Sequence, residues 1–192
     1  MQQVKAQHIS GGSGYEVGQS LLFDEDSYGY LQRTATSGTS RKKWTWSGWI
    51  KRSSASYGLL FGASTSADMW NTSTATYISF PEPTKMALYN NGRYILWPSV
   101  QFRDYSAWGH LVVSVDTTQD DEKDRAKIFW NGVRLEEGPG PNYLNKDEDT
   151  FVNDPGLPHL IGGSDSAGGP NPQHPFYDGY LSETHLIDGQ AL

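Results

Sequence analysis

The chain of 192 residues contains no cysteine. A disulfide framework, a thiolate nucleophile and a zinc site built on cysteine are therefore excluded, and the hydrophobic core must stabilise the fold. Long apolar runs are also missing: there is no stretch of about 18 apolar residues, and residues 1–20 lack the apolar segment of a signal peptide. The sequence predicts a soluble chain, made without a Sec-type leader and with no membrane insertion.

Positive charge is scarce, with 15 Lys and Arg against 22 Asp and Glu and a formal net charge of -7. A surface of this charge repels a phosphate backbone, so only a concentrated basic patch could bind nucleic acid. The one basic cluster spans 41–43 and is followed by Lys51 and Arg52. Basic residues beside a strand are typical of a solvated sheet edge, and we expect no nucleic-acid partner.

Residues that favour turns and strands are abundant: 21 Gly, 10 Pro, 11 Tyr and 7 Trp. In the stretch KWTWSGWIKR (43–52), Trp44, Trp46 and Ile50 fall on one face and the residues between them on the other. This period of two predicts a central strand. No window of ten residues carries the apolar stripe of a helix, so an all-β chain is expected.

Other short apolar runs predict further strands, at 20–23, 30–33, 58–62, 76–80, 85–89, 92–97, 108–116, 125–130, 133–136 and 159–163. Asn91-Gly92 and Asn131-Gly132 lie between pairs of these runs and favour tight hairpin turns, because both positions tolerate positive φ. About a dozen short strands and no convincing helix favour a two-sheet antiparallel sandwich or jelly roll.

Two parts of the chain carry more specific expectations. The segment 137–158 is rich in Gly, Pro, Asn and acids, and it predicts a long surface excursion with one short strand near Phe151. Near the C-terminus, Tyr177, Leu181, Glu183 and Ile187 are spaced for one face of a last strand, which would return to pair with the first.

The chain divides into a polar arm at 1–19 and one domain at 20–192. The arm has four glycines and no strand or helix period, so it is either a disordered leader or a segment that becomes ordered against a neighbouring subunit.

Three blocks carry a family resemblance: WTWSGWIKR at 44–52 with its preceding Lys, WGHLVVSVDTT followed by DRAKIFWNGVRLEE, and FYDGYLSETHLIDGQAL at 176–192. Their order resembles that of laminin-G-like, concanavalin A-like jelly-roll domains over about residues 20–192. The ending LIDGQAL is similar to a subgroup found in structural proteins of tailed bacteriophages, on tail fibres or other surface parts of the particle. The resemblance also implies that a calcium ion can be held between loops at one rim, with no ligand assignable; no cofactor is required.

The acidic residues do not form the pattern of a sandwich glycosidase, in which an acid and a nucleophile alternate along one strand. They cluster instead in expected loops, at 24–26, 120–124, 136–137 and 147–149. There is no G-x-S-x-G elbow, and GGSGYEVG lacks the lysine and the preceding strand of a phosphate-binding loop. The chain is therefore expected not to be an enzyme.

Three functions remain. The first is a non-catalytic virion surface protein of a tailed phage, a tail-fibre or capsid-decoration module. Its partners would be other virion proteins, copies of itself and a host-surface polysaccharide. The second is a stand-alone lectin-like module, whose aromatic rings stack on sugars. Its candidate ligand-binding residues, chosen near expected turns, are Trp70, Tyr89, Tyr94, Trp97 and Tyr105. A glycoside hydrolase is the least favoured of the three.

Overall fold

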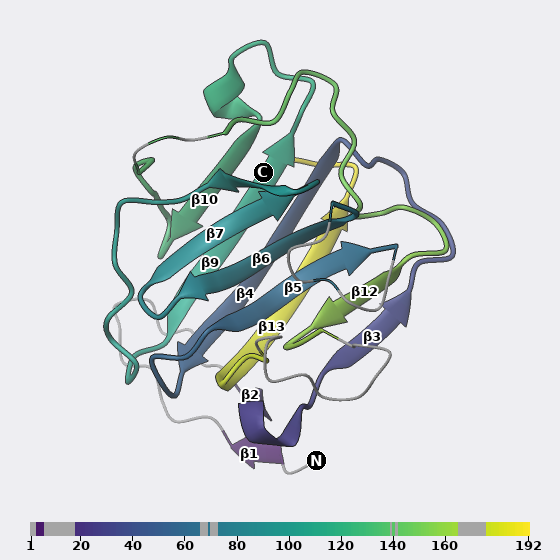
Figure 1. Cartoon of the computed structure of the whole chain (residues 1–192). Coiled ribbons are helices and arrows are strands. Elements are labelled where there is room, and N and C mark those ends of the chain that lie inside the picture. The colour runs from purple at the N-terminus through teal and green to yellow at the C-terminus, as the bar shows by residue number, and fades with distance from the viewer. Residues whose placement is uncertain are drawn as a thin grey trace.

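The computed structural model describes residues 3–5, 18–65, 69, 73–138, 140, 142–164 and 176–192. Within these residues two antiparallel sheets pack face to face, and Figure 1 shows the two layers of arrows one behind the other. The described residues include only two short helical turns, at Glu25–Ser27 and Glu122–Asp124. The expected two-sheet all-β sandwich is confirmed.

One sheet has seven strands, in the spatial order β1 (Gln3–Lys5), β2 (Gln19–Phe23), β13 (Gly179–Asp188), β4 (Lys43–Arg52), β9 (Gly109–Asp116), β10 (Ala126–Trp130) and β11 (Val133–Arg134). The other has six, in the order β3 (Leu31–Thr34), β12 (Pro158–Ile161), β5 (Gly58–Ser64), β6 (Ala75–Glu82), β7 (Lys85–Asn90) and β8 (Arg93–Leu96). The last strand, β13, pairs with both β2 and β4, so the expected return to the first apolar run is confirmed.

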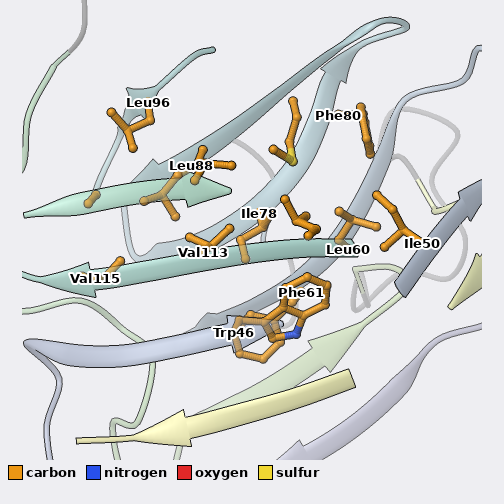
Figure 2. Close-up of a cluster of buried hydrophobic side chains, with 14 of the residues drawn as sticks. Trp46, Ile50, Leu60, Phe61, Ile78, Phe80, Leu88, Leu96, Val113 and Val115 are labelled. Atoms are coloured by element: carbon orange, nitrogen blue, oxygen red, sulfur yellow. The ribbon is translucent and has the colours of Figure 1, made fainter. Parts of the chain in front are cut away.

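The main core fills the space between the sheets (Figure 2). Trp44, Trp46 and Ile50 project into it from β4, as the period of two predicts, and the ring of Trp46 stacks on Phe61 of the facing sheet at 6.0 Å. Burial of these large side chains supplies the stabilisation that disulfides cannot give this chain.

Both expected hairpin turns form. Asn91 and Gly92 join β7 to β8 with φ values of 49° and 84°, and Asn131 and Gly132 join β10 to β11 with 50° and 80°. Asn and Gly accept these left-handed angles at little cost, which is why the turns form at these two dipeptides.

The C-terminal strand differs from the expected pattern. Leu181 pairs with Ile50 on the core side, whereas Ile187 pairs with Thr45 on the opposite face. The cause is a β-bulge between Ser182 and His185, where Glu183 has a φ of 48°. A bulge adds one residue to a strand and reverses the alternation beyond it, so Glu183 and Ile187 do not share a face with Leu181.

The excursion after β11 also departs from its prediction. The strand expected near Phe151 is wrong: residues 151–153 form a turn, and β12 begins at Pro158. In the arm, residues 3–5 form β1 along the edge of β2, while the other residues of 1–17 lie outside the described part of the chain.

Candidate functional site

A second hydrophobic cluster lies on the face of the six-stranded sheet that is turned away from the main core. Apart from residue 69, its buried members come from that sheet alone: Leu59, Met69, Ala75, Tyr77, Tyr89 and Leu160. Tyr77 and Tyr89 stack at 4.3 Å between ring centroids, Tyr94 meets Tyr89 edge-on at 5.2 Å, and Trp97 meets Tyr94 at 5.0 Å. The structure therefore joins three of the five candidate residues in one aromatic row.

Exposure divides this row. Tyr89 is only 3% exposed and packs as a core residue, so its ring is not available to a ligand. Tyr94 and Trp97 are half-buried and lie at the end of the row, on and just after the edge strand β8. We call Tyr94 and Trp97 the β8 aromatic platform.

A charged pair borders the platform. The Lys85 ammonium lies 5.4 Å from the centre of the Trp97 ring and 2.9 Å from the Glu82 carboxylate. The attraction between a cation and the ring face holds Lys85 beside the indole. The indole Nε1 of Trp97 is buried and has no hydrogen-bond partner among the described residues. The platform thus combines apolar ring faces with a neighbouring donor and acceptor.

The excursion holds the platform in place from one side. The Gly138 amide donates to the Trp97 carbonyl at 2.8 Å, and the Asn142 side chain donates to the Tyr94 carbonyl at 3.3 Å. A Cβ on residue 138 would lie 2.3 Å from that Trp97 oxygen, so this approach requires glycine.

Glu148 anchors the same excursion to the β7–β8 turn. Its carboxylate accepts a hydrogen bond from the side-chain amide of the buried Asn90 at 2.8 Å and forms an ion pair with Arg93 at 2.5 Å. It also accepts from the backbone and side chain of Asn145. Sequence reasoning placed Glu148 in a solvated acidic loop, but its side chain is only 12% exposed. One acidic residue in a run of three gives no signal that it is the buried one.

The other two candidate residues do not join the platform. The Arg52 guanidinium carbon lies 5.1 Å from the centre of the Tyr105 ring and 4.1 Å from the centre of the Phe80 ring. Arg52 donates to the carbonyls of Pro83 and Ser56, and burial lowers its pKa. Tyr105 therefore covers a structural arginine. Trp70 lies outside the described residues.

A cavity of about 420 Å³ opens on the other side of the sandwich, between the edge strand β3, its neighbour β12 and the facing strand β13. Its apolar lining includes Phe61, Ile161 and Leu186, and its polar lining includes Arg33 and Thr184. We call it the inter-sheet cavity. A second cavity of about 260 Å³ adjoins it and shares Leu31, Ile161 and Thr184. Sequence reasoning missed this region, because strands far apart in the chain build it.

One end of the inter-sheet cavity is held by a hydrogen-bonded network. The Asp188 carboxylate accepts from the amides of Thr39 at 2.6 Å and Ser40 at 3.1 Å, and from the Asn153 side chain at 2.8 Å. The backbone N–H of Asn153 donates to His159 Nε2 at 3.0 Å. His159 therefore carries its hydrogen on Nδ1 and donates it to the Leu157 carbonyl. Burial lowers the pKa of His159. Asp188 belongs to the LIDGQAL ending, so this motif fixes a loop at the cavity.

Calcium needs several oxygen ligands around one point. Among the described residues, no group of three or more Asp, Glu or His side chains lies close enough to hold an ion. The Asp116 carboxylate, at the end of β9, accepts hydrogen bonds from the backbone and hydroxyl of Thr118 in the following turn.

In the described part of the chain, no helix is long and apolar enough to cross a bilayer.

Comparison with known proteins identifies the fold. No family model matches the chain, and no curated protein sequence matches it. Among solved structures, the heptameric SAP-like pentraxin from Limulus polyphemus is 18% identical with a TM-score of 0.62, over 90% of this chain and 76% of that one. The LG4-5 domains of the mouse laminin alpha1 chain are 14% identical with a TM-score of 0.59, over 96% of this chain and 45% of that one.

A sialidase from Trypanosoma rangeli, bound to a difluoro sugar-acid derivative, is 12% identical with a TM-score of 0.56. The match covers 93% of this chain but only 26% of the sialidase. At these identities the likeness establishes the fold, which is a jelly roll of the laminin-G and pentraxin type. The predicted laminin-G-like, concanavalin A-like architecture is confirmed.

Proposed function

We propose that this chain is a non-catalytic jelly-roll module that binds carbohydrate through the β8 aromatic platform. The observation that carries the proposal is the half-buried Tyr94 and Trp97 pair on a sheet edge, with the Lys85–Glu82 pair beside it. Sugar rings present apolar C–H faces that stack on such rings, while their hydroxyls need nearby donors and acceptors. The platform supplies both within one small area.

The rigidity of the platform supports this role. Glu148 and Gly138 fix the excursion against β8, so the rings are held in position before a ligand arrives. A preorganised site loses little conformational entropy on binding, which favours affinity for a weakly interacting ligand such as a sugar.

The described cavities favour binding without catalysis. Counting described residues only, the inter-sheet cavity has no carboxylate in its lining, and the smaller cavities beside Arg52 and beside β2 have one each, Asp104 and Glu183. Hydrolysis of a glycosidic bond usually needs two carboxyl groups about 5 to 9 Å apart across a sugar. The proposed module therefore binds sugar and leaves it intact. We propose that the platform binds sugar directly through its rings and the Lys85–Glu82 pair, without a bridging metal ion.

We further propose that the module is displayed on the surface of a tailed-phage particle, on a tail fibre or on the capsid. This rests on the LIDGQAL ending and on the cysteine-free composition, which suits folding in a reducing cytoplasm. Its partners would be other virion proteins and copies of itself. The heptameric assembly of the Limulus pentraxin gives a precedent for self-association on this fold. Mass spectrometry of purified particles tests this location, and absence of the chain from them would refute it.

The carbohydrate proposal is tested on an array of bacterial surface glycans with the full chain, in buffer with calcium and in buffer with EDTA. We expect hits that are insensitive to EDTA and no release of reducing sugar from the bound glycans. An array without hits would contradict glycan binding. Hits lost in EDTA would contradict the metal-free mode, and sugar release would contradict the non-catalytic role.

A further inference from the structure

The inter-sheet cavity is lined by a cationic group that no described residue neutralises. Among the described residues of its lining, Arg33 is the one charged side chain and none is a carboxylate. Arg33 forms no ion pair or side-chain hydrogen bond with any described residue. A guanidinium at a cavity wall, with its donors unused, is a recognition group for a carboxylate, since its fork can bind both oxygens at once.

The neighbour of Arg33 cannot supply the missing acceptor. His159 pairs with Arg33 across β12 and β3, but its Nε2 already accepts from Asn153 and its Nδ1 donates to Leu157. Burial and the nearby Arg33 charge both act to keep the imidazole neutral, through a lowered pKa. Arg33 therefore has no counter-charge within the described part of the chain, and a bound anion would supply one.

The rest of the lining resembles the surface of a sugar-binding pocket. Hydroxyls of Thr36, Ser37 and Thr184 line the cavity and make no side-chain hydrogen bond with described residues. Phe61 and Ile161 provide an apolar floor. A volume of about 420 Å³ lies within the range of small-ligand sites, about 300 to 1,000 Å³.

The β-bulge of β13 shapes this wall. Glu183 has a φ of 48°, an angle that non-glycine residues adopt at a cost, and Thr184 follows it within the bulge. Thr184 lies opposite Gly48, where an added Cβ would approach its methyl group to 3.1 Å. Bulges in this position re-aim side chains and are frequent beside binding sites.

We propose that the inter-sheet cavity binds one acidic monosaccharide, with its carboxylate on Arg33 and its hydroxyls on the threonine and serine side chains. This site is separate from the β8 aromatic platform, because β3 and β8 are the two opposite edges of the six-stranded sheet. It extends the proposed function by a second subsite that reads negative charge.

Isothermal titration calorimetry of the full chain tests this site with glucuronate, N-acetylneuraminate, glucose and lactate. We expect at least one of the two sugar acids to bind, and to bind about tenfold or more tightly than glucose and lactate. The tighter of the two sugar acids identifies the class of acidic sugar. Equal affinity for glucose would refute charge recognition, equal affinity for lactate would refute sugar recognition, and no binding would refute the site.

Variants assign the binding to the cavity. Arg33→Gln is expected to weaken binding of the sugar acid by about tenfold or more. Arg33→Lys should weaken it less, because the positive charge is kept and only the bidentate geometry of the guanidinium is lost. Arg103→Gln removes an equal charge from an exposed position outside the cavity and should leave the affinity unchanged. An equal loss in Arg103→Gln would refute the site. Trp97→Ala should not affect this binding, so the platform and the cavity can fail independently.

Discussion

The two edges of the six-stranded sheet are built in different ways. At the β8 edge, two half-buried rings lie beside the excursion, and Glu148 anchors the excursion to the β7–β8 turn. At the β3 edge, all four strand residues are exposed and a cavity opens toward β13, with its loop held by Asp188. One edge offers aromatic faces, and the other offers a guanidinium that has no partner among the described residues. On the proposed account, one fold provides two chemically different binding surfaces, and one carboxylate holds the loop beside each of them.

The largest expected effect is at the β8 edge. Trp97→Ala removes the larger ring of the platform and should weaken binding to the array glycans by about 30-fold, or about 2 kcal/mol, as for a central aromatic hot spot. Tyr57→Ala, at an exposed aromatic outside the platform, is the matched control and should have no effect. Titration calorimetry and a melting curve of each variant separate lost binding from lost folding. Equal losses of binding in both variants would contradict sugar binding at the platform.

Glu148→Gln tests the anchor of that edge. The substitution breaks the pair with Arg93 and weakens the bonds to Asn90 and Asn145, so we expect about 2 kcal/mol less stability by denaturant unfolding. Platform binding should fall with it, because the excursion loosens. Asp149→Asn changes the adjacent, exposed carboxylate and should be neutral. If both variants unfold at the same denaturant concentration as the wild type, Glu148 is not an anchor.

Asp188→Ala makes the corresponding test at the β3 edge. It removes the acceptor for the Thr39 and Ser40 amides and for Asn153, and should cost about 1 kcal/mol, less than at Glu148 because Asp188 is exposed. Hydrogen exchange should accelerate at Thr39 and Ser40 but not in β8. Faster exchange at both edges would mean that the edges are not independent.

The smallest effect concerns pH. Because burial lowers the pKa of His159 in the folded chain below the ordinary value of 6.5, the unfolded chain binds more protons below that pH. This contribution to stability is present above pH 6.5 and is lost as the pH falls toward the folded pKa. His159→Gln should therefore flatten the fall in unfolding free energy between about pH 7 and pH 5. The pKa of His110 is also lowered, by burial and by His185, so part of the slope should persist. An unchanged slope would contradict the account of His159.

Local patterns predicted much of the fold and part of the β8 edge. Alternation defined β4 and its core tryptophans, and the Asn-Gly dipeptides fixed two hairpin turns, because these features depend on neighbours in sequence. The same locality placed Tyr89, Tyr94 and Trp97 near one turn. It could not tell that Tyr89 is buried, since the covering contacts come from other strands.

The cavity at the β3 edge could not be predicted from the sequence, for the same physical reason. Arg33 and His159 are brought together by the pairing of β3 with β12, and Thr184 reaches them from β13 of the facing sheet. No local sequence period predicts a cavity between such distant segments. The bulge at Glu183 reversed the expected faces of the last strand, and a single extra residue leaves no clear signature in one sequence. The burial of Glu148 could not be predicted either, because this residue belongs to an acidic run that is typical of a solvated loop.

The most direct test of carbohydrate binding at the β8 edge is an NMR titration of the labelled chain with the strongest oligosaccharide from the array. The account predicts the largest shift at the Trp97 indole N–H, with further shifts at Tyr94 and Lys85. Shifts concentrated on the outer face of the seven-stranded sheet, where Trp49 packs on His110 at 5.1 Å, would contradict it.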